Sequence, residues 1–212
     1  KKYFNLPRMI LIIYVLISVV LTLNTLNQFQ SLPSPLYGGD YYYQAGSVEH
    51  ISSGGNVLES SSMKGGNPGY LPLYGIIVSA FKNLFSLGTF YAMFIMNILF
   101  LIAGIIINFI LFKLFTKNDW YALTITVIFV TPQIILKYTS ITKLIMIPLF
   151  FMALLTYERK KDIRSSAFLG LSWGLLSWSH HAAFIGSSIV MMGFLLTPFI
   201  KLKNKFKEIK EI

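Results

Sequence analysis

Residues 98–112, with the sequence ILFLIAGIIINFILF, decide the fold class of this chain. The run has no charged residue, and Asn108 is its one polar side chain. A membrane-spanning β-strand would alternate apolar and polar positions, and this run does not. The run belongs to the longer segment 89–115, and this segment exceeds the roughly 20 residues that an α-helix needs to cross about 30 Å of hydrocarbon. The segment is therefore predicted to be a transmembrane helix.

The composition of the whole chain also predicts a membrane protein. Of its 212 residues, 55% are hydrophobic and 12% are charged, a balance that would expose too much apolar surface on a soluble domain. The absence of cysteine excludes disulfides and thiolate metal sites. The net charge of +10 comes from lysines and arginines beside the apolar runs, where membrane orientation accounts for them. Membrane lipid is thus a predicted partner and nucleic acid is not.

Six segments are predicted to cross the membrane, namely 6–26, 89–115, 120–136, 144–157, 166–178 and 182–200. A seventh segment, 70–87, either crosses the membrane or lies on its surface. Six crossings place 14 of the 18 lysines and arginines on one side, whereas seven crossings place 11 there. Because the cytoplasmic side carries the excess of positive charge near span ends, six crossings are favoured.

The pattern within residues 70–87, YLPLYGIIVSAFKNLFSL, favours a surface helix. Small or polar side chains recur every three or four positions, at Gly75, Ser79, Lys82 and Ser86. The other side carries the apolar residues Leu73, Ile77, Phe81 and Leu84. This pattern predicts an amphipathic helix at the outer membrane boundary. The alternative is a helix packed inside the bundle, because glycine and serine also serve helix-to-helix contacts.

The predicted architecture is an all-α integral membrane protein with about six transmembrane helices. Residues 1–212 form one module, in which residues 28–88 make a long first loop outside the cytoplasm, with short amphipathic helices. The chain lacks an initial Met and finishes in the charged segment KLKNKFKEIKEI, so we expect it to be part of a longer protein. Asn97, Asn108 and Ser172 fall within predicted spans and are interpreted as helix-to-helix contacts.

The chemistry available on the outside face centres on Asp40, in a chain with eight acidic residues. A carboxylate there could act as a general base or as a ligand of a hard cation. Alternatively, Asp40 caps a short helix over residues 41–52 by accepting backbone N–H bonds. The two roles can coexist, since a capping carboxylate keeps one oxygen free.

Three cationic or titratable residues join Asp40 on this face. Lys143, at the outer start of the fourth span, could hold a lipid-linked phosphate, or its amine could reach up to the headgroups without a function. His180 and His181, in the turn between the last two spans, could bind a phosphate or a sugar hydroxyl, or merely form the turn. Adjacent histidines point in different directions on a helix, which argues against a metal site made by this pair.

Aromatic residues near Asp40 are candidates for sugar binding. Tyr42 and Tyr43, in the run 41–43, and Trp178 are rings of the kind that stack on sugars. The alternative is the belt of tyrosine and tryptophan that lies at membrane boundaries.

Several stretches resemble a known superfamily. GGDYYYQAGSVEHISSGG (38–55) has an acid followed by aromatic residues and a short helix, and NPGYLPLYGIIVSAF (67–81) has a Pro- and Tyr-rich helix entry. Next comes a predicted span with Pro132 near its outer end, WYALTITVIFVTPQIILKYTS (120–140). A span, a basic turn and a further span that ends in a Ser-Trp turn follow in FFMALLTYERKKDIRSSAFLGLSWGLLSWSHHAAF (150–184). Together they resemble the GT-C superfamily of membrane glycosyltransferases, in particular oligosaccharyltransferase catalytic subunits and protein mannosyltransferases.

This resemblance implies a function. It implies transfer of a sugar or glycan from a polyprenyl-phosphate donor to a protein or glycan acceptor, at the outer face of the cell membrane, with inversion at the sugar. Asp40 would be the acidic residue of the family and act as the base that activates the acceptor, with Lys143, His180 and His181 near the phosphate.

One departure from the family pattern limits this implication. The turn YTSITKLIMIP (138–148) lacks the second acid that oligosaccharyltransferases carry there. A divalent cation held mainly by protein carboxylates is therefore not favoured. The alternative function is a non-catalytic GT-C-like scaffold or a subunit of a larger complex.

Overall fold

The computed structural model of this chain describes residues 5–27, 39–61, 66, 71–130 and 141–210, and within these ranges the side chains of all but residues 25–27, 39–40 and 198–210. The described residues form helices and turns and no strand, which confirms the all-α prediction. In chain order the helices are α1 (Leu6–Asn27), α2 (Gly39–Ser52), α3 (Leu73–Phe85), α4 (Thr89–Thr116), α5 (Asp119–Phe129), the π-helix η3 (Thr142–Met146), α6 (Ile147–Lys160), α7 (Ile163–Ser177) and α8 (His181–Lys210).

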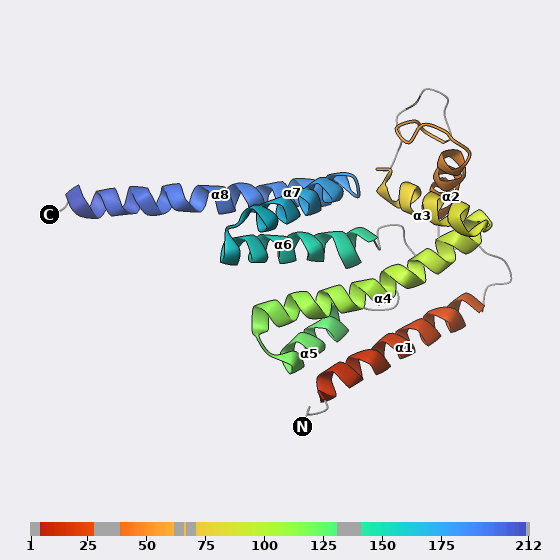
Figure 1. Ribbon diagram of the computed structural model, residues 1–212, viewed down its shortest axis with the longest axis horizontal. Coiled ribbons are helices and arrows are strands. Elements are labelled where there is room, and N and C mark those ends of the chain that lie inside the picture. The colour runs from red at the N-terminus through yellow and green to blue at the C-terminus, as the bar shows by residue number, and fades with distance from the viewer. Residues whose placement is uncertain (1–4, 28–38, 62–65, 67–70, 131–140, 211–212) are drawn as a thin grey trace.

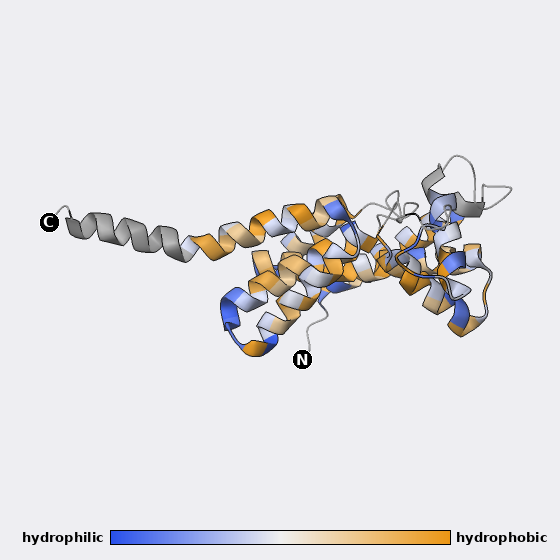
Figure 2. Cartoon of the chain, turned by 90° about the horizontal axis from the view of Figure 1, so that it is seen from above, coloured by the Kyte–Doolittle hydropathy of each residue, from blue (hydrophilic) through white to orange (hydrophobic). Residues whose placement is uncertain are grey.

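The long helices lie along a common direction, and the short helices α2 and α3 pack at one end of them (Figure 1). α4 is the central element, because α1, α2, α3, α5, η3 and α6 all pack against it. Hydrophobic residues follow the long helices, while hydrophilic residues gather at the turns (Figure 2). The end that carries α2, α3 and the α7–α8 turn is called the loop end below.

Two tight turns at the opposite end use the same local design. Lys117 and Lys161 close α4 and α6 in the left-handed conformation, with φ of 55° and 50°. The next residue in each case caps the following helix: the Asn118 side chain accepts from the Trp120 N–H at 2.8 Å, and Asp162 accepts from the Ser165 N–H at 2.7 Å. Capping side chains satisfy N–H groups that the first helical turn leaves without partners. This design reverses the chain within two residues.

Charge joins the helices at this end, which is called the cationic end below. Asp119 accepts a hydrogen bond from Asn5 at 2.7 Å and pairs with Arg8 at 3.6 Å and with Lys113 at 2.6 Å. The start of α1, the end of α4 and the start of α5 therefore meet at one carboxylate. The Arg159 guanidinium of α6 adds a hydrogen bond to the Leu114 carbonyl at 2.9 Å.

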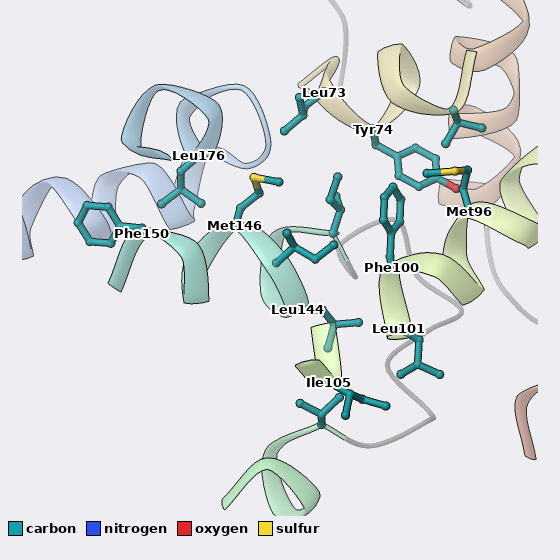
Figure 3. Close-up of a cluster of buried hydrophobic side chains, with 14 of the residues drawn as sticks. Leu73, Tyr74, Met96, Phe100, Leu101, Ile105, Leu144, Met146, Phe150 and Leu176 are labelled. Atoms are coloured by element: carbon teal, nitrogen blue, oxygen red, sulfur yellow. The ribbon is translucent and has the colours of Figure 1, made fainter. Parts of the chain in front are cut away.

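The core joins α3, α4, η3, α6 and α7. Leu73 of α3 lies above Met146 of η3 and near Leu176 of α7, while Leu144 points toward Leu101 and Ile105 of α4 (Figure 3). Phe150 of α6 is fully buried in the same cluster. The loop end is thus part of one continuous core rather than a separate layer.

The small side chains of α3 form its packed face. A Cβ atom at Gly75 would lie 3.0 Å from the Ile51 side chain and 3.1 Å from the Ser47 hydroxyl of α2. The Ser79 hydroxyl donates to the Val48 carbonyl at 2.8 Å. Leu84, on the predicted membrane face, is 76% exposed. Glycine and serine thus serve contact with α2 here, as the alternative interpretation of this pattern holds, while the position of α3 at a membrane boundary stays a prediction.

Among the described residues, two helices, α1 over Leu6–Asn24 and α4, are long and apolar enough to cross a membrane, judged by length and composition. The segments Asp119–Phe129 and His181–Thr197 are shorter apolar helices. The predicted spans at 6–26, 89–115, 144–157, 166–178 and 182–200 each correspond to helix in the structure. In the segment 120–136, residues 120–129 are helical and residues 131–136 lie outside the described residues.

Candidate functional site

The loop end brings α3 and the α7–α8 turn into direct contact. The Leu73 backbone N–H at the start of α3 donates to the Trp178 carbonyl at 3.2 Å. Pro72 precedes Leu73, and its missing N–H falls where a helix start has no internal partner. This hydrogen bond joins segments more than 100 positions apart in the sequence. The turn that contains Trp178 continues directly into His180 and His181.

His180 and His181 occupy different environments. His180 lies in the turn and is partly buried, while His181 is the first residue of α8 and is exposed. The His180 backbone N–H donates to the Leu176 carbonyl at 3.3 Å, so the turn continues the hydrogen bonding of α7. Both histidines lie at the loop end, and that this end faces outside stays a prediction.

Asp40 lies in the first turn of α2. The helix begins at Gly39, so Asp40 is its second residue and does not precede the helix. The prediction that Asp40 caps a helix starting at residue 41 is therefore wrong in its register. A carboxylate in the first helical turn is still favoured by the partial positive charge of the helix N-terminus. The Asp40 side chain is outside the described side chains, so its role as a base stays a prediction.

Lys143 lies in the π-helix η3, with an exposed side chain between the buried residues Thr142 and Leu144. η3 packs against α4 and α7, and Figure 1 places its start toward the loop end. Lys143 thus lies near the start of a helix, as predicted, and that this start faces outside stays a prediction. Residues 131–140, with Lys137 and Pro132, lie outside the described residues.

Tyr42 and Tyr43 follow Asp40 in the first turns of α2. The Tyr42 side chain is 44% exposed, and Tyr43 is partly buried. Trp178, in the α7–α8 turn, is 47% exposed. Three aromatic side chains at the loop end are thus at least partly accessible to a ligand, and their role in sugar binding stays a prediction.

A polar cluster joins α2, α3 and the start of α4. The Glu49 carboxylate accepts from the Lys82 amine at 2.7 Å and from the Thr89 hydroxyl, and Lys82 also donates to the Ser52 hydroxyl at 2.8 Å. The hydrogen bond from Lys82, followed by that from Thr89, lowers the pKa of Glu49 below its usual value. Sequence reasoning missed this pairing, because the two charges are separated by 33 residues.

Two buried asparagines of α4 contact other helices, which confirms their interpretation from the sequence. Asn97 accepts from the Tyr74 hydroxyl at 3.3 Å, and Asn108 donates to the Leu144 carbonyl of η3 at 3.0 Å. Burial raises the pKa of Tyr74, so this hydroxyl stays protonated and acts as the donor. The Ser172 hydroxyl instead bonds within its own helix, to the Leu169 carbonyl at 2.9 Å.

Within the part of the chain that the structure describes, no group of three histidine, aspartate or glutamate side chains is placed to hold a metal ion. The Glu49 carboxylate of α2 pairs with Lys82.

Comparison with known proteins finds a relative in Methanocaldococcus jannaschii. The chain is 45% identical to uncharacterized protein MJ1080 over 119 residues, which are 56% of this chain and 88% of the relative. The chain belongs to the family of this archaeal protein. The relative's name states no activity, so the family membership brings no function with it. No family model matches the chain, and no solved structure matches it.

Proposed function

We propose that the chain is an integral membrane protein with six spanning helices, which are α1, α4, α5, η3 with α6, α7 and α8. The length of η3 with α6 supports this proposal. The two helices follow each other without a break and contain 5 and 14 residues. Their combined length is about 28 Å at about 1.5 Å per residue, close to the thickness of the hydrocarbon layer.

Apolar side chains on the outside of the bundle support a lipid environment. Ile12, Leu16 and Val20 form one stripe along α1, and they are 60%, 60% and 61% exposed. Ile185 and Ile189 of α8 are 60% and 66% exposed. Apolar surface exposed to water costs about 25 cal/mol of free energy for every Å². Lipid tails would cover these side chains and remove that cost.

The distribution of charge supports an orientation. The cationic end gathers Arg8, Lys113, Lys117, Arg159, Lys160 and Lys161. Positive residues near span ends face the cytoplasm, so the loop end would face outward from the cell membrane. Asp40, Lys143, His180 and His181 would then share the outer face.

For activity, we propose transfer of a sugar or glycan from a polyprenyl-phosphate donor to a protein or glycan acceptor at this face. Asp40 would take the proton of the acceptor as the sugar is transferred. Lys143 and one histidine of the pair 180–181 would stabilise the charge on the leaving phosphate. The observation that carries the proposal is the 3.2 Å hydrogen bond from Leu73 to Trp178, which joins α3 to the turn of His180 and His181, while α2, the helix of Asp40, packs on α3.

A second candidate is a non-catalytic scaffold with the same fold. The turn 138–148 has no acid, and the Glu49 carboxylate at the loop end is already paired with Lys82. A scaffold needs neither a base nor a metal. The two candidates differ in whether the chain transfers a sugar, and only the enzyme would need Asp40 for it.

The test is sugar transfer by membranes of cells that produce the chain, supplied with labelled polyprenyl-phosphate sugar donors. We expect Asp40→Asn to lower the transfer rate by roughly 10² to 10⁴, the usual contribution of a general base. The matched control is Asp119→Asn, a carboxylate at the cationic end, which should leave the rate unchanged. Transfer should persist in EDTA, because the Lys143 amine and a histidine side chain, and not a metal ion, would stabilise the phosphate.

Equal transfer by wild type and Asp40→Asn would remove Asp40 from catalysis. A complete lack of transfer from every donor, with wild type and variant equally folded in detergent, would support the scaffold.

A further inference from the structure

The π-helical turn η3 lies directly before a proline, and the two features are connected. In a regular α-helix the N–H of residue 148 would donate to the carbonyl of Leu144, four residues earlier. Pro148 has no N–H, so this carbonyl is left without its helical partner. The helix widens at this point: the Ile147 N–H donates to the Thr142 carbonyl, five residues back, which is the spacing of a π-helix.

A side chain from another helix supplies the missing donor. The Asn108 amide of α4 donates to the Leu144 carbonyl at 3.0 Å and to the Gly104 carbonyl of its own helix at 2.8 Å. Both partners are carbonyl oxygens, so only the NH₂ group of Asn108 can face them. Asn108 is 6% exposed, and Leu144 is 2% exposed. A buried carbonyl without a partner would be costly here, and Asn108 removes that cost.

Gly104 makes this contact possible. A Cβ atom at Gly104 would lie 2.6 Å from the Leu144 Cβ atom, closer than side chains can approach. Glycine therefore lets η3 come close enough to α4 for Asn108 to reach the Leu144 carbonyl. Gly104, Asn108 and Pro148 act together to hold one turn of helix.

We propose that Asn108 is a positioning residue that holds the π-helical turn, and that this turn presents Lys143 to the phosphate of a polyprenyl carrier. The second half rests on the proposed function, and the first half does not. A return to regular α-helix would remove the extra residue of the π-turn and rotate Lys143 by about 100° relative to α6. Lys143 is exposed in the present geometry, and the rotation would carry it toward the side now buried against α4 and α7.

Three variants test the turn itself. Asn108→Leu removes the donor at similar volume, and it should lower the melting temperature in detergent by roughly 3 to 10 °C. Pro148→Ala restores a backbone N–H at residue 148. In the double variant Asn108→Leu with Pro148→Ala this N–H can bond the Leu144 carbonyl, so the melting temperature should return to within about 2 °C of that of Pro148→Ala. Asn97→Leu is the matched control, and Pro148→Ala should not rescue it.

The position of residue 143 is measured separately by cysteine labelling. The chain has no cysteine of its own, so a single introduced cysteine is the one site that reacts. Lys143→Cys should react with a charged maleimide in the wild-type background and at least about 10-fold more slowly in the double variant. The functional half is measured as binding of farnesyl phosphate, with farnesol and inorganic phosphate as comparison ligands. Wild type should bind farnesyl phosphate, whereas Lys143→Ala and the double variant should bind it at least about 10-fold more weakly.

The outcomes separate the two halves. An unchanged melting temperature in Asn108→Leu, or equal labelling of residue 143 in the double variant, would overturn the positioning role. Equal binding by wild type and Lys143→Ala would overturn the phosphate contact, and with it the role of Lys143 in the proposed function, while the turn would stand. Binding of inorganic phosphate as strong as that of farnesyl phosphate would also overturn a carrier site.

Discussion

The main interactions that join the helices differ between the two ends of the helical bundle. At the cationic end, charged side chains from α1, α4 and α5 converge on Asp119, and tight turns close the chain. At the loop end, small side chains let backbones approach, as at Gly75 against Ser47, and buried hydroxyls bond to carbonyls, as at Ser79. Paired charges stay close to water, while close packing excludes it. The comparison indicates that ion pairs to one carboxylate join the helices at the cationic end, whereas close packing, together with the Glu49–Lys82 pair, joins them at the loop end.

The largest expected effect tests whether the two ends face different compartments. Ser53 at the loop end and Lys160 at the cationic end are both exposed. In intact cells, Ser53→Cys should react with a membrane-impermeant maleimide and Lys160→Cys should not, because the bilayer would separate them. Labelling of both in permeabilised cells is the control. Equal labelling in intact cells would break the comparison.

The next effect concerns the close packing of the loop end. Gly75→Leu places a large side chain where Ile51 and Ser47 leave room for none, and overpacking of this kind costs about 1–3 kcal/mol. The melting temperature in detergent should fall by several degrees. Gly170→Leu is the matched control, since no atom lies within 4 Å of a Cβ there, and it should melt at or above the wild-type temperature. An equal loss in both variants would mean that α2 and α3 are not packed as described.

A smaller effect is expected at the cationic end. Asp119→Asn removes the charge that Arg8 and Lys113 share, and exposed ion pairs contribute at most about 1 kcal/mol. The difference in melting temperature from wild type should shrink between low and high salt, because ions screen the pairs. Gly75→Leu should show no such salt dependence. A salt-independent loss in Asp119→Asn would indicate that packing, not charge, holds this end.

The smallest effect is a pH dependence at Glu49. Its pKa is lowered by Lys82 in the folded state, so the pair stabilises the fold above the unfolded pKa, and this contribution is lost as pH falls through the folded pKa. Because Glu49 is exposed, we expect only about 0.3 kcal/mol. Wild type should melt slightly above Glu49→Gln at about pH 6, and the two should converge near about pH 3. A difference that grows on acidification would contradict the assigned pair.

The sequence predicted the helices well, because long apolar runs such as 98–112 leave few alternatives to a helix. It left two environments open for the Gly75 and Ser79 face, since small residues pattern alike whether they meet water or another helix, and the structure shows the contact with α2. It placed the start of α2 two residues late, because glycine at position 39 is a weak helix signal. Contacts between distant residues, such as Glu49 with Lys82, leave no local pattern.

The π-helical turn shows the same limit most clearly. Pro148 predicts a disturbed helix, but nothing near it in the sequence names the partner that compensates for the lost N–H. That partner is Asn108, which lies 36 residues before Leu144. Only the folded arrangement of α4 and η3 reveals it.

The turn at Lys117 and Asn118 has a consequence for biosynthesis. A connection this short ties α4 and α5 into a helical hairpin as soon as both have left the ribosome. α5 is an 11-residue helix in the described residues, too short to partition into lipid alone, whereas the 28 residues of α4 are not. In a membrane, α4 would therefore carry α5 into the bilayer, and a longer, flexible linker at this turn would leave α5 outside the lipid during translation.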